Sequence, residues 1–285
     1  MANRRDFLKT TAVIAAATMI YPMAAFTPEK KTIGLQLYTV RDKIQQDLKT
    51  TLEKVAKIGY NSCEAAGYNA SDGTFYGMAA KEFVKLLNGL GMPLNSSHTV
   101  FEIDSAEKVI GDAAAAGAKY IIYPYLADQF RTNLDGWKAT VEKFNKMGEI
   151  AKSHGIKFGY HNHAFEFEKI EDQVPYDLLL TQTDPSLVTF EMDTYWVTRG
   201  GQNPVDYFKK YPGRFGLWHI KDMVKTDDMF FAPVGTGRMD FASIFAEKET
   251  AGMKYFFVEQ DSFKDMDAFE SIEISYKYLN NAKFL

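Results

Sequence analysis

The sequence has a single cysteine, little surplus of charge of either sign, and no apolar run that could span a membrane. Cys63 is the only cysteine among 285 residues, which excludes an internal disulfide and a cysteine-based zinc centre. The formal net charge of −4 and a pI near 5.8 argue against a nucleic-acid partner, because phosphate binding needs Lys and Arg concentrated on one face. The 46% hydrophobic and 25% charged residues are ordinary for a globular protein. A disordered or fibrous chain is therefore excluded.

The amino terminus has the pattern of an export signal. Asn3, Arg4 and Arg5 precede Phe-Leu-Lys, and an apolar run over residues 11–20 leads to small residues. That run is shorter than the about 20 residues that a transmembrane helix needs, and it lacks the polar face of an amphipathic helix. The paired arginines resemble the twin-arginine signal, which exports folded proteins, although Asn3 stands where Ser or Thr is usual. We therefore expect residues 1–26 to be a leader and the protein to be exported, with a periplasmic location.

Short apolar runs alternate with segments of helical periodicity in the rest of the chain. The runs predict eight strands, at residues 33–38, 62–65, 94–98, 120–123, 157–161, 188–192, 215–220 and 255–259. A helical segment such as Leu48-Leu52-Val55-Ile58 follows each run, and glycine often ends it, as Gly155 and Gly252 do.

This alternation predicts parallel strands joined by right-handed crossovers. Eight such units over about 255 residues favour one α/β domain, a closed (β/α)8 TIM barrel over residues 27–285. An open doubly wound sheet is the alternative, but it usually carries a Gly-rich phosphate loop after its first strand. Residues 39–42 at that place, Thr-Val-Arg-Asp, contain no glycine. The barrel is the better prediction.

Polar residues lie at the carboxyl ends of the predicted strands, where TIM barrels build their active sites. Strands five to eight end in His161, Asp193, His219 and Glu259. Two imidazoles and two carboxylates on consecutive strands can converge on one point and hold one divalent cation, Mn, Zn, Co, Fe or Mg. Each residue alone is more often a hydrogen-bonded group at a strand end, but carboxylates buried together without a cation repel each other. The set therefore predicts a metal centre.

Four segments resemble a known family: Gly-Tyr-His-Asn-His-Ala-Phe-Glu-Phe (159–167), Phe-Glu-Met-Asp-Thr-Tyr-Trp (190–196), Leu-Trp-His-Ile-Lys-Asp (217–222) and Val-Glu-Gln (258–260). They are similar to the sugar phosphate isomerase/epimerase family of xylose-isomerase-like barrels, and residues 233–241 are similar to its Gly-x-Gly-x-x-Asp-Phe loop. The metal of that family is held by Glu, Asp, His and Glu from strands five to eight. The resemblance implies Asp193, His219 and Glu259 as ligands, whereas His161 replaces the glutamate of relatives.

The resemblance also implies the chemistry, which is removal of a proton next to a carbonyl with help from the metal. Lys221, Glu259 and Glu64 are the candidates for moving protons, and the pKa of Lys221 can fall near a cation. A salt bridge from Lys221 to Glu191 or Glu64 is the alternative for that residue. The candidates for substrate binding, together with the apolar face of Phe165, are His98, His163, Trp196 and Arg238.

The expected substrate is an unphosphorylated sugar or keto-sugar, because an exported protein meets few phosphosugars. A lyase or dehydratase acting on a 3-keto-glycoside or inosose is the close alternative, since elimination uses the same enolate. A non-catalytic carbohydrate-binding barrel is a further alternative, which the retained ligands disfavour. An apurinic endonuclease is disfavoured by the acidic pI and by Trp196 where its three-metal cluster would want histidine. The sequence is also compatible with a homo-oligomer.

Overall fold

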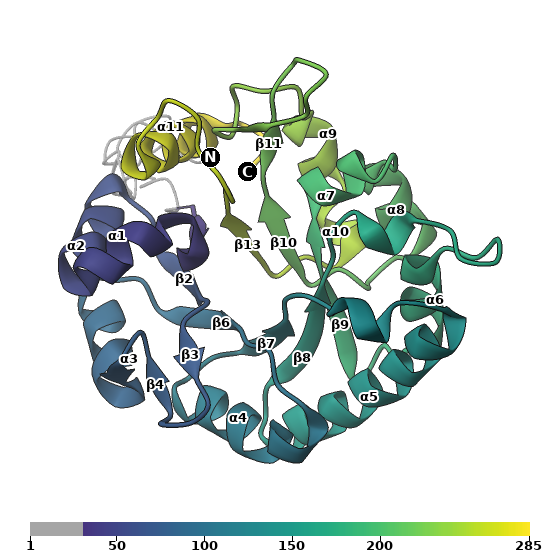
Figure 1. Ribbon diagram of the computed structural model, residues 1–285. Helices are drawn as coiled ribbons and strands as arrows, with labels where there is room; N and C mark the ends of the chain where they lie inside the picture. Colours follow the sequence, from purple (N-terminus) through teal and green to yellow (C-terminus); the bar gives the residue numbers. More distant parts are fainter. Residues whose placement is uncertain (1–30) are drawn as a thin grey trace, which may run out of the picture. The chain divides into compact units, whose positions relative to one another are not determined.

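Eight parallel strands close into a barrel, and helices surround it on the outside (Figure 1). The computed structural model describes residues 31–285, which form one compact unit. In order around the barrel the strands are β1 (Gly34–Gln36), β13 (Tyr255–Val258), β10 (Leu217–Ile220), β9 (Val188–Asp193), β8 (Lys157–His161), β7 (Tyr120–Tyr123), β6 (Leu94–His98) and β2 (Ser62–Ala65). The predicted TIM barrel is confirmed. The predicted leader at residues 1–26 lies outside the described residues.

The helices follow the strands as the sequence predicts. They are α1 (Arg41–Gln46), α2 (Leu48–Ile58), α3 (Ala80–Gly89), α4 (Ile103–Ala115), α5 (Leu134–Ser153), α6 (Pro175–Gln182), α7 (Thr194–Arg199), α8 (Pro204–Lys210), α9 (Phe241–Ala246), α10 (Lys248–Ala251) and α11 (Ala268–Asn281). Gly155, just after α5, and Gly252, just after α10, have φ angles of +76° and +82°. Glycine adopts this left-handed conformation without steric cost, so both helices end where the sequence predicts. No helix within residues 31–285 is both long and apolar enough to cross a bilayer.

Short additional elements lie in the loops at the carboxyl end of the barrel. They are a three-stranded sheet of β3 (Tyr68–Asn69), β4 (Thr74–Phe75) and β5 (Met78–Ala79), the pair β11 (Asp222–Met223) and β12 (Phe231–Ala232), and the 3-10 turns η1 (Leu37–Val40), η2 (Asp128–Phe130) and η3 (Phe165–Phe167).

Several predicted strand limits differ from the structure by one or two residues, and two of these differences have a clear physical reason. The first strand ends at Gln36 rather than at residue 38, because the Gln36 side chain accepts a hydrogen bond from the Tyr38 N–H and starts a 3-10 turn. The sixth strand reaches Asp193, whose carboxylate accepts the Trp196 N–H and caps α7. The metal-ligand candidate on that strand is therefore also held by the helix that follows it.

The interior of the barrel is apolar at its amino end and polar at its carboxyl end. Ile122, Leu217 and Phe257 pack together inside the amino half. Gly159 leaves them room, because a Cβ at this position would lie 2.6 Å from Ile122 Cδ1. Side chains alternate along a strand, so the next inward residue of β8 after Gly159 is His161. The change from apolar to polar interior therefore lies between Gly159 and His161.

Candidate functional site

A cavity of about 690 Å³ opens at the carboxyl ends of the barrel strands. The sequence-predicted residues in its wall are His98, His161, His163, Trp196, Lys221 and Glu259. Tyr38, Val100 and Tyr125 form part of its outer rim and are largely exposed. This volume is typical of a site for a small organic molecule.

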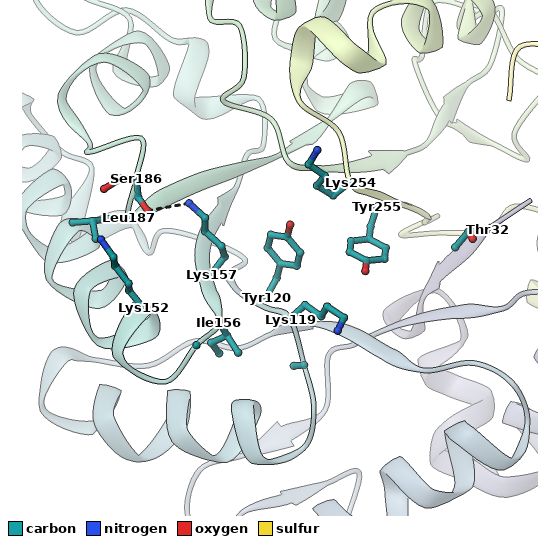
Figure 2. A pocket seen from close by; sticks show the side chains of 12 residues that line it. Thr32, Lys119, Tyr120, Lys152, Ile156, Lys157, Ser186, Leu187, Lys254 and Tyr255 are labelled. Atoms are coloured by element: carbon teal, nitrogen blue, oxygen red, sulfur yellow. Dashed lines mark hydrogen bonds between the residues drawn. The ribbon is translucent and has the colours of Figure 1, made fainter.

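A second cavity of about 790 Å³ lies at the amino ends of β7, β8 and β13 (Figure 2). Four lysines contribute to its wall: Lys119, Lys152, Lys157 and Lys254. None of its 12 described lining residues is a histidine or a carboxylate, so it offers neither a proton acceptor of that kind nor a metal site. The cavity at the carboxyl end is therefore the candidate active site, although it is the smaller of the two.

The four predicted metal ligands lie at the ends of four neighbouring strands, with ligand atoms within 4.8 Å of one another. His161 Nδ1 lies 3.2 Å from the carbonyl oxygen of Pro124, which can only accept, so Nδ1 carries the proton and Nε2 is left as a free lone pair. That Nε2 lies 3.2 Å from Asp193 Oδ2, which is also an acceptor. Two acceptors facing each other fit a cation between them.

His219 gives a second indication that these residues fit a cation. Its Nδ1 lies 2.7 Å from Glu259 Oε2 and 3.8 Å from Asp193 Oδ2, yet it has no hydrogen-bond partner of acceptable geometry among the described residues. The donor set of two nitrogens and two carboxylates suits a divalent transition metal. The residues present therefore fit the predicted metal.

The Lys221 ammonium lies on the cavity wall between carboxylates. Its Nζ is 2.6 Å from Glu259 Oε2, 2.9 Å from Asp193 Oδ2 and 2.9 Å from Asp261 Oδ2. These are the ion-pair partners of Lys221 in the structure, in place of the Glu191 or Glu64 that the sequence suggested. Lys221 is therefore held beside two of the predicted metal ligands.

Carboxylates around the Lys221 ammonium set its pKa. Burial opposes the charge on Lys221, but Asp193, Asp261 and Glu259 together hold its pKa well above the ordinary value. The fall that the sequence suggested applies beside a bound cation and stays a prediction. Burial raises the pKa of Asp193 to about 6, against the opposing effect of Lys221. Burial also acts to raise the pKa of Glu259, but Lys221 and His219 keep it well below the ordinary value. A bound cation would compete with Lys221 for the same carboxylates.

Glu64 is fully buried and is not among the residues that line the cavity. Its Oε2 accepts hydrogen bonds from Gln36 Nε2 at 2.8 Å and from His219 Nε2 at 2.6 Å. The neighbouring His98 borders the cavity and separates Glu64 from it. The predicted role of Glu64 as an acid or base stays a prediction.

Two aromatic side chains with unused polar atoms face each other across the cavity wall. The rings of His163 and Trp196 lie 5.4 Å apart, and Phe165 stacks on the other side of His163 at 5.7 Å. His163 Nδ1 and Trp196 Nε1 are buried without a hydrogen-bond partner in the described chain. These two atoms are enclosed by the protein, so it is other parts of both side chains that border the cavity. The predicted role of His163 and Trp196 in substrate binding stays a prediction.

Arg238 lies away from the cavity. Its guanidinium contacts Met223 Sδ at 2.7 Å, and it is not one of the cavity-lining residues. The structure therefore does not bring this predicted substrate-binding residue to the site. The loop that carries Arg238 is held in place by Asp222. The Asp222 carboxylate accepts hydrogen bonds from the N–H groups of Gly235 and Gly237.

Sequence reasoning missed Glu166 behind the site. This buried carboxyl accepts hydrogen bonds from the Tyr160 hydroxyl at 2.6 Å and from the His163 N–H at 2.9 Å, which fixes the loop that carries His163. Burial raises its pKa to about 7. The sequence does hold a sign of this role, because Glu166 lies between two phenylalanines, five residues after His161. A carboxyl group buried in an apolar turn needs hydrogen-bond donors around it.

Comparisons with known proteins agree with this fold. A solved sugar phosphate isomerase/epimerase from Parabacteroides distasonis superimposes with a TM-score of 0.82 at 32% identity, covering 91% of this chain and 96% of that one. An inosose dehydratase from Clostridium beijerinckii is 30% identical over 138 residues, and one from Clostridium botulinum 29% over 157 residues. These matches cover 43% and 48% of this chain, and they span about half the length of the dehydratases, 46% and 52%. The profile of the xylose isomerase-like TIM barrel family matches residues 52–280, and the chain belongs to that family.

Proposed function

We propose that this chain is a metal-dependent isomerase or epimerase that moves a proton on the carbon next to the carbonyl of an unphosphorylated sugar or keto-sugar. The observation that carries the proposal is the cavity wall formed by Lys221 and Glu259. An ammonium and a carboxylate 2.6 Å apart offer a proton donor and a proton acceptor to one substrate.

The metal would be held by His161, Asp193, His219 and Glu259. When bound, a divalent cation there supplies Lewis acidity toward a carbonyl oxygen. The protein itself supplies orientation: Pro124 fixes the His161 ring, and α7 fixes the Asp193 carboxylate through the Trp196 N–H. These contacts hold the ligands in place without any rearrangement of the chain.

The proton transfers are assigned to the groups that line the cavity. Glu259, with its low pKa, is ionised and can accept the proton from the substrate carbon. The Lys221 ammonium can return a proton to carbon for isomerisation or epimerisation. His163 and Trp196 would pack against the substrate and exclude water from one side.

An unphosphorylated substrate is favoured by the charges of the cavity. Lys221 is the one Lys or Arg among the described lining residues, and it already faces three carboxylates. Phosphate recognition needs cationic side chains or free backbone N–H groups that are not paired in this way. Arg238, the other candidate for an anion, lies outside the cavity.

The dehydration of a keto-sugar such as an inosose, or elimination from a 3-keto-glycoside, is the second candidate. It is favoured by the inosose dehydratases among the relatives. The same groups serve it: Glu259 takes the proton from carbon, the C–O bond at the next carbon breaks, and Lys221 protonates the leaving oxygen as the double bond forms.

The test is hydrogen exchange in D₂O with purified protein, added Mn²⁺, Co²⁺ or Zn²⁺, and a panel of keto-sugars and 3-keto-glycosides. Deuterium should enter the product or the recovered substrate, and a chelator should abolish the exchange. Lys221→Met should slow exchange by roughly 10²-fold. The control Lys225→Met removes an exposed lysine four residues further on and should leave the rate unchanged. Exchange in Lys221→Met at the wild-type rate would exclude Lys221 as proton carrier, and loss of water with a new enone absorbance would identify the dehydratase.

We also propose that residues 1–26 direct export to the periplasm. The support is the Arg4-Arg5 pair before the apolar run. Changing both arginines to lysine should leave uncleaved protein in the cytoplasm, as seen by fractionation and mass spectrometry. Unchanged processing would refute the twin-arginine assignment.

A further inference from the structure

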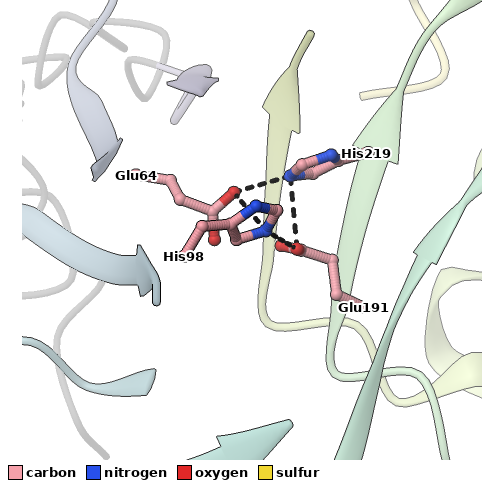
Figure 3. A group of neighbouring side chains, drawn as sticks. All are labelled: Glu64, His98, Glu191 and His219. Carbon is pink, nitrogen blue, oxygen red and sulfur yellow. Dashed lines mark hydrogen bonds and ion pairs between the residues drawn. The ribbon is translucent and has the colours of Figure 1, made fainter. Parts of the chain in front are cut away.

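Four side chains from four different strands meet beneath the floor of the cavity (Figure 3). Glu64 comes from β2, His98 from β6, Glu191 from β9 and His219 from β10, and all four are buried. No pattern in the sequence groups these four residues, and of the four only His98 lines the cavity. We call them the deep group.

The deep group is a ring in which imidazole nitrogens and carboxylate oxygens alternate. His219 Nε2 lies 2.6 Å from Glu64 Oε2 and 3.3 Å from Glu191 Oε2. His98 Nε2 lies 2.5 Å from Glu191 Oε2 and 3.4 Å from Glu64 Oε2. Figure 3 shows the four side chains pointing toward one another.

Hydrogen bonds alone account poorly for this ring. The Nε2 protons of His98 and His219 can fill the two short contacts of 2.5 and 2.6 Å, but no proton remains for the contacts of 3.3 and 3.4 Å. The second oxygen of each glutamate, Oε1, is buried without any hydrogen-bond partner in the described chain. Burying two carboxylates with unpartnered oxygens is costly unless a positive charge lies between them.

A divalent cation would satisfy both the geometry and the charge. Four ligands at about 2.0–2.1 Å around a tetrahedral metal lie about 3.3 Å from one another. The contacts of 3.3 and 3.4 Å in the ring match this spacing, and those of 2.5 and 2.6 Å would lengthen when an ion enters. Two neutral imidazoles and two carboxylates balance the charge of one divalent ion. His98 borders the cavity and provides a path by which the ion can enter.

We propose that the deep group holds a second divalent cation, distinct from the one at His161, Asp193, His219 and Glu259. His219 belongs to both groups, because its Nε2 faces the deep group and its Nδ1 faces Glu259 and Asp193. When both ions bind, the proton of the His219 ring is released to solvent, and the ring bridges the two sites. The glutamates of the deep group then act as ligands and not as proton carriers for the substrate.

Charge across the two groups supports two ions. Glu64, Glu191, Asp193 and Glu259 are buried carboxylates, and Asp261 adds a fifth that is partly exposed. Lys221 is the one ammonium among them. Two divalent cations would compensate most of the remaining negative charge, including that of the bridging His219 ring, whereas one would compensate less than half of it.

The test is metal stoichiometry, measured by mass spectrometry of elements after stripping the full chain with chelator and dialysing it against Zn²⁺ or Mn²⁺. The wild type should bind two ions. Glu64→Gln/Glu191→Gln should bind one, and His161→Ala should also bind one, but at the deep group. Glu166→Gln is the matched control, because it changes another fully buried glutamate outside both groups and should keep two ions.

The outcomes separate this proposal from the proposed function. If the wild type binds only one ion and Glu64→Gln/Glu191→Gln still binds it, the deep site is overturned and the proposed function is left intact. A single ion that persists in His161→Ala and disappears in Glu64→Gln/Glu191→Gln would support the deep site and refute the metal centre used in the proposed function. If the double variant does not fold, anomalous diffraction from wild-type crystals grown with Zn²⁺ decides: a peak between the four side chains supports the proposal, and its absence refutes it.

Discussion

Glu166 should make the stability of this protein depend on pH in a way that one substitution can isolate. Burial raises its pKa to about 7 from an ordinary value of 4.5. Between these values the folded protein binds a proton that the unfolded chain has lost, so the free energy of unfolding falls as pH rises from 4.5 to 7. A pKa shift of this size corresponds to roughly 3 kcal/mol, present in full below pH 4.5 and lost above pH 7.

The variant that tests this is Glu166→Gln, which cannot ionise and still offers an oxygen to the Tyr160 hydroxyl. Urea unfolding of wild type and variant at pH 5 and pH 8 should show the variant gaining about 2–3 kcal/mol relative to wild type at the higher pH. Comparing differences removes the contribution of the other buried carboxylates. Glu168→Gln, on the exposed side of the same segment, should show no such change. A difference between Glu166→Gln and wild type that is independent of pH would refute the burial argument.

The packing inside the barrel makes one further prediction. Gly159→Ala should lower the free energy of unfolding by roughly 1–3 kcal/mol, because the new Cβ would lie 2.6 Å from Ile122 Cδ1 and 3.1 Å from the Thr189 carbonyl oxygen. Urea titration measures it, and a loss below half a kcal/mol would show that the interior relaxes around the methyl group.

The sequence by itself determined the fold and the residues of the predicted metal centre. Strand and helix periods are local, and they predicted eight units whose strands lie where the structure has them, apart from shifts of a few residues. Because the side chains of a strand alternate between its two faces, the sequence could also place Gly159 and His161 on one inward face. In a parallel barrel all strand ends share one rim, which is why His161, Asp193, His219 and Glu259 could be grouped without coordinates.

Only the tertiary structure decided which partners these residues have and how deep each one lies. Glu64 and His219 are 155 residues apart, and their contact depends on how the closed barrel staggers its strands. The same stagger places Glu64 and Glu191 below the cavity floor and Lys221 in its wall, although all three lie at or near strand ends in the sequence. Arg238 was assigned by its motif to the site, but Asp222 ties its loop to the outside of the cavity. Depth and partner choice depend on the packing of distant strands, and no local pattern of residues contains that information.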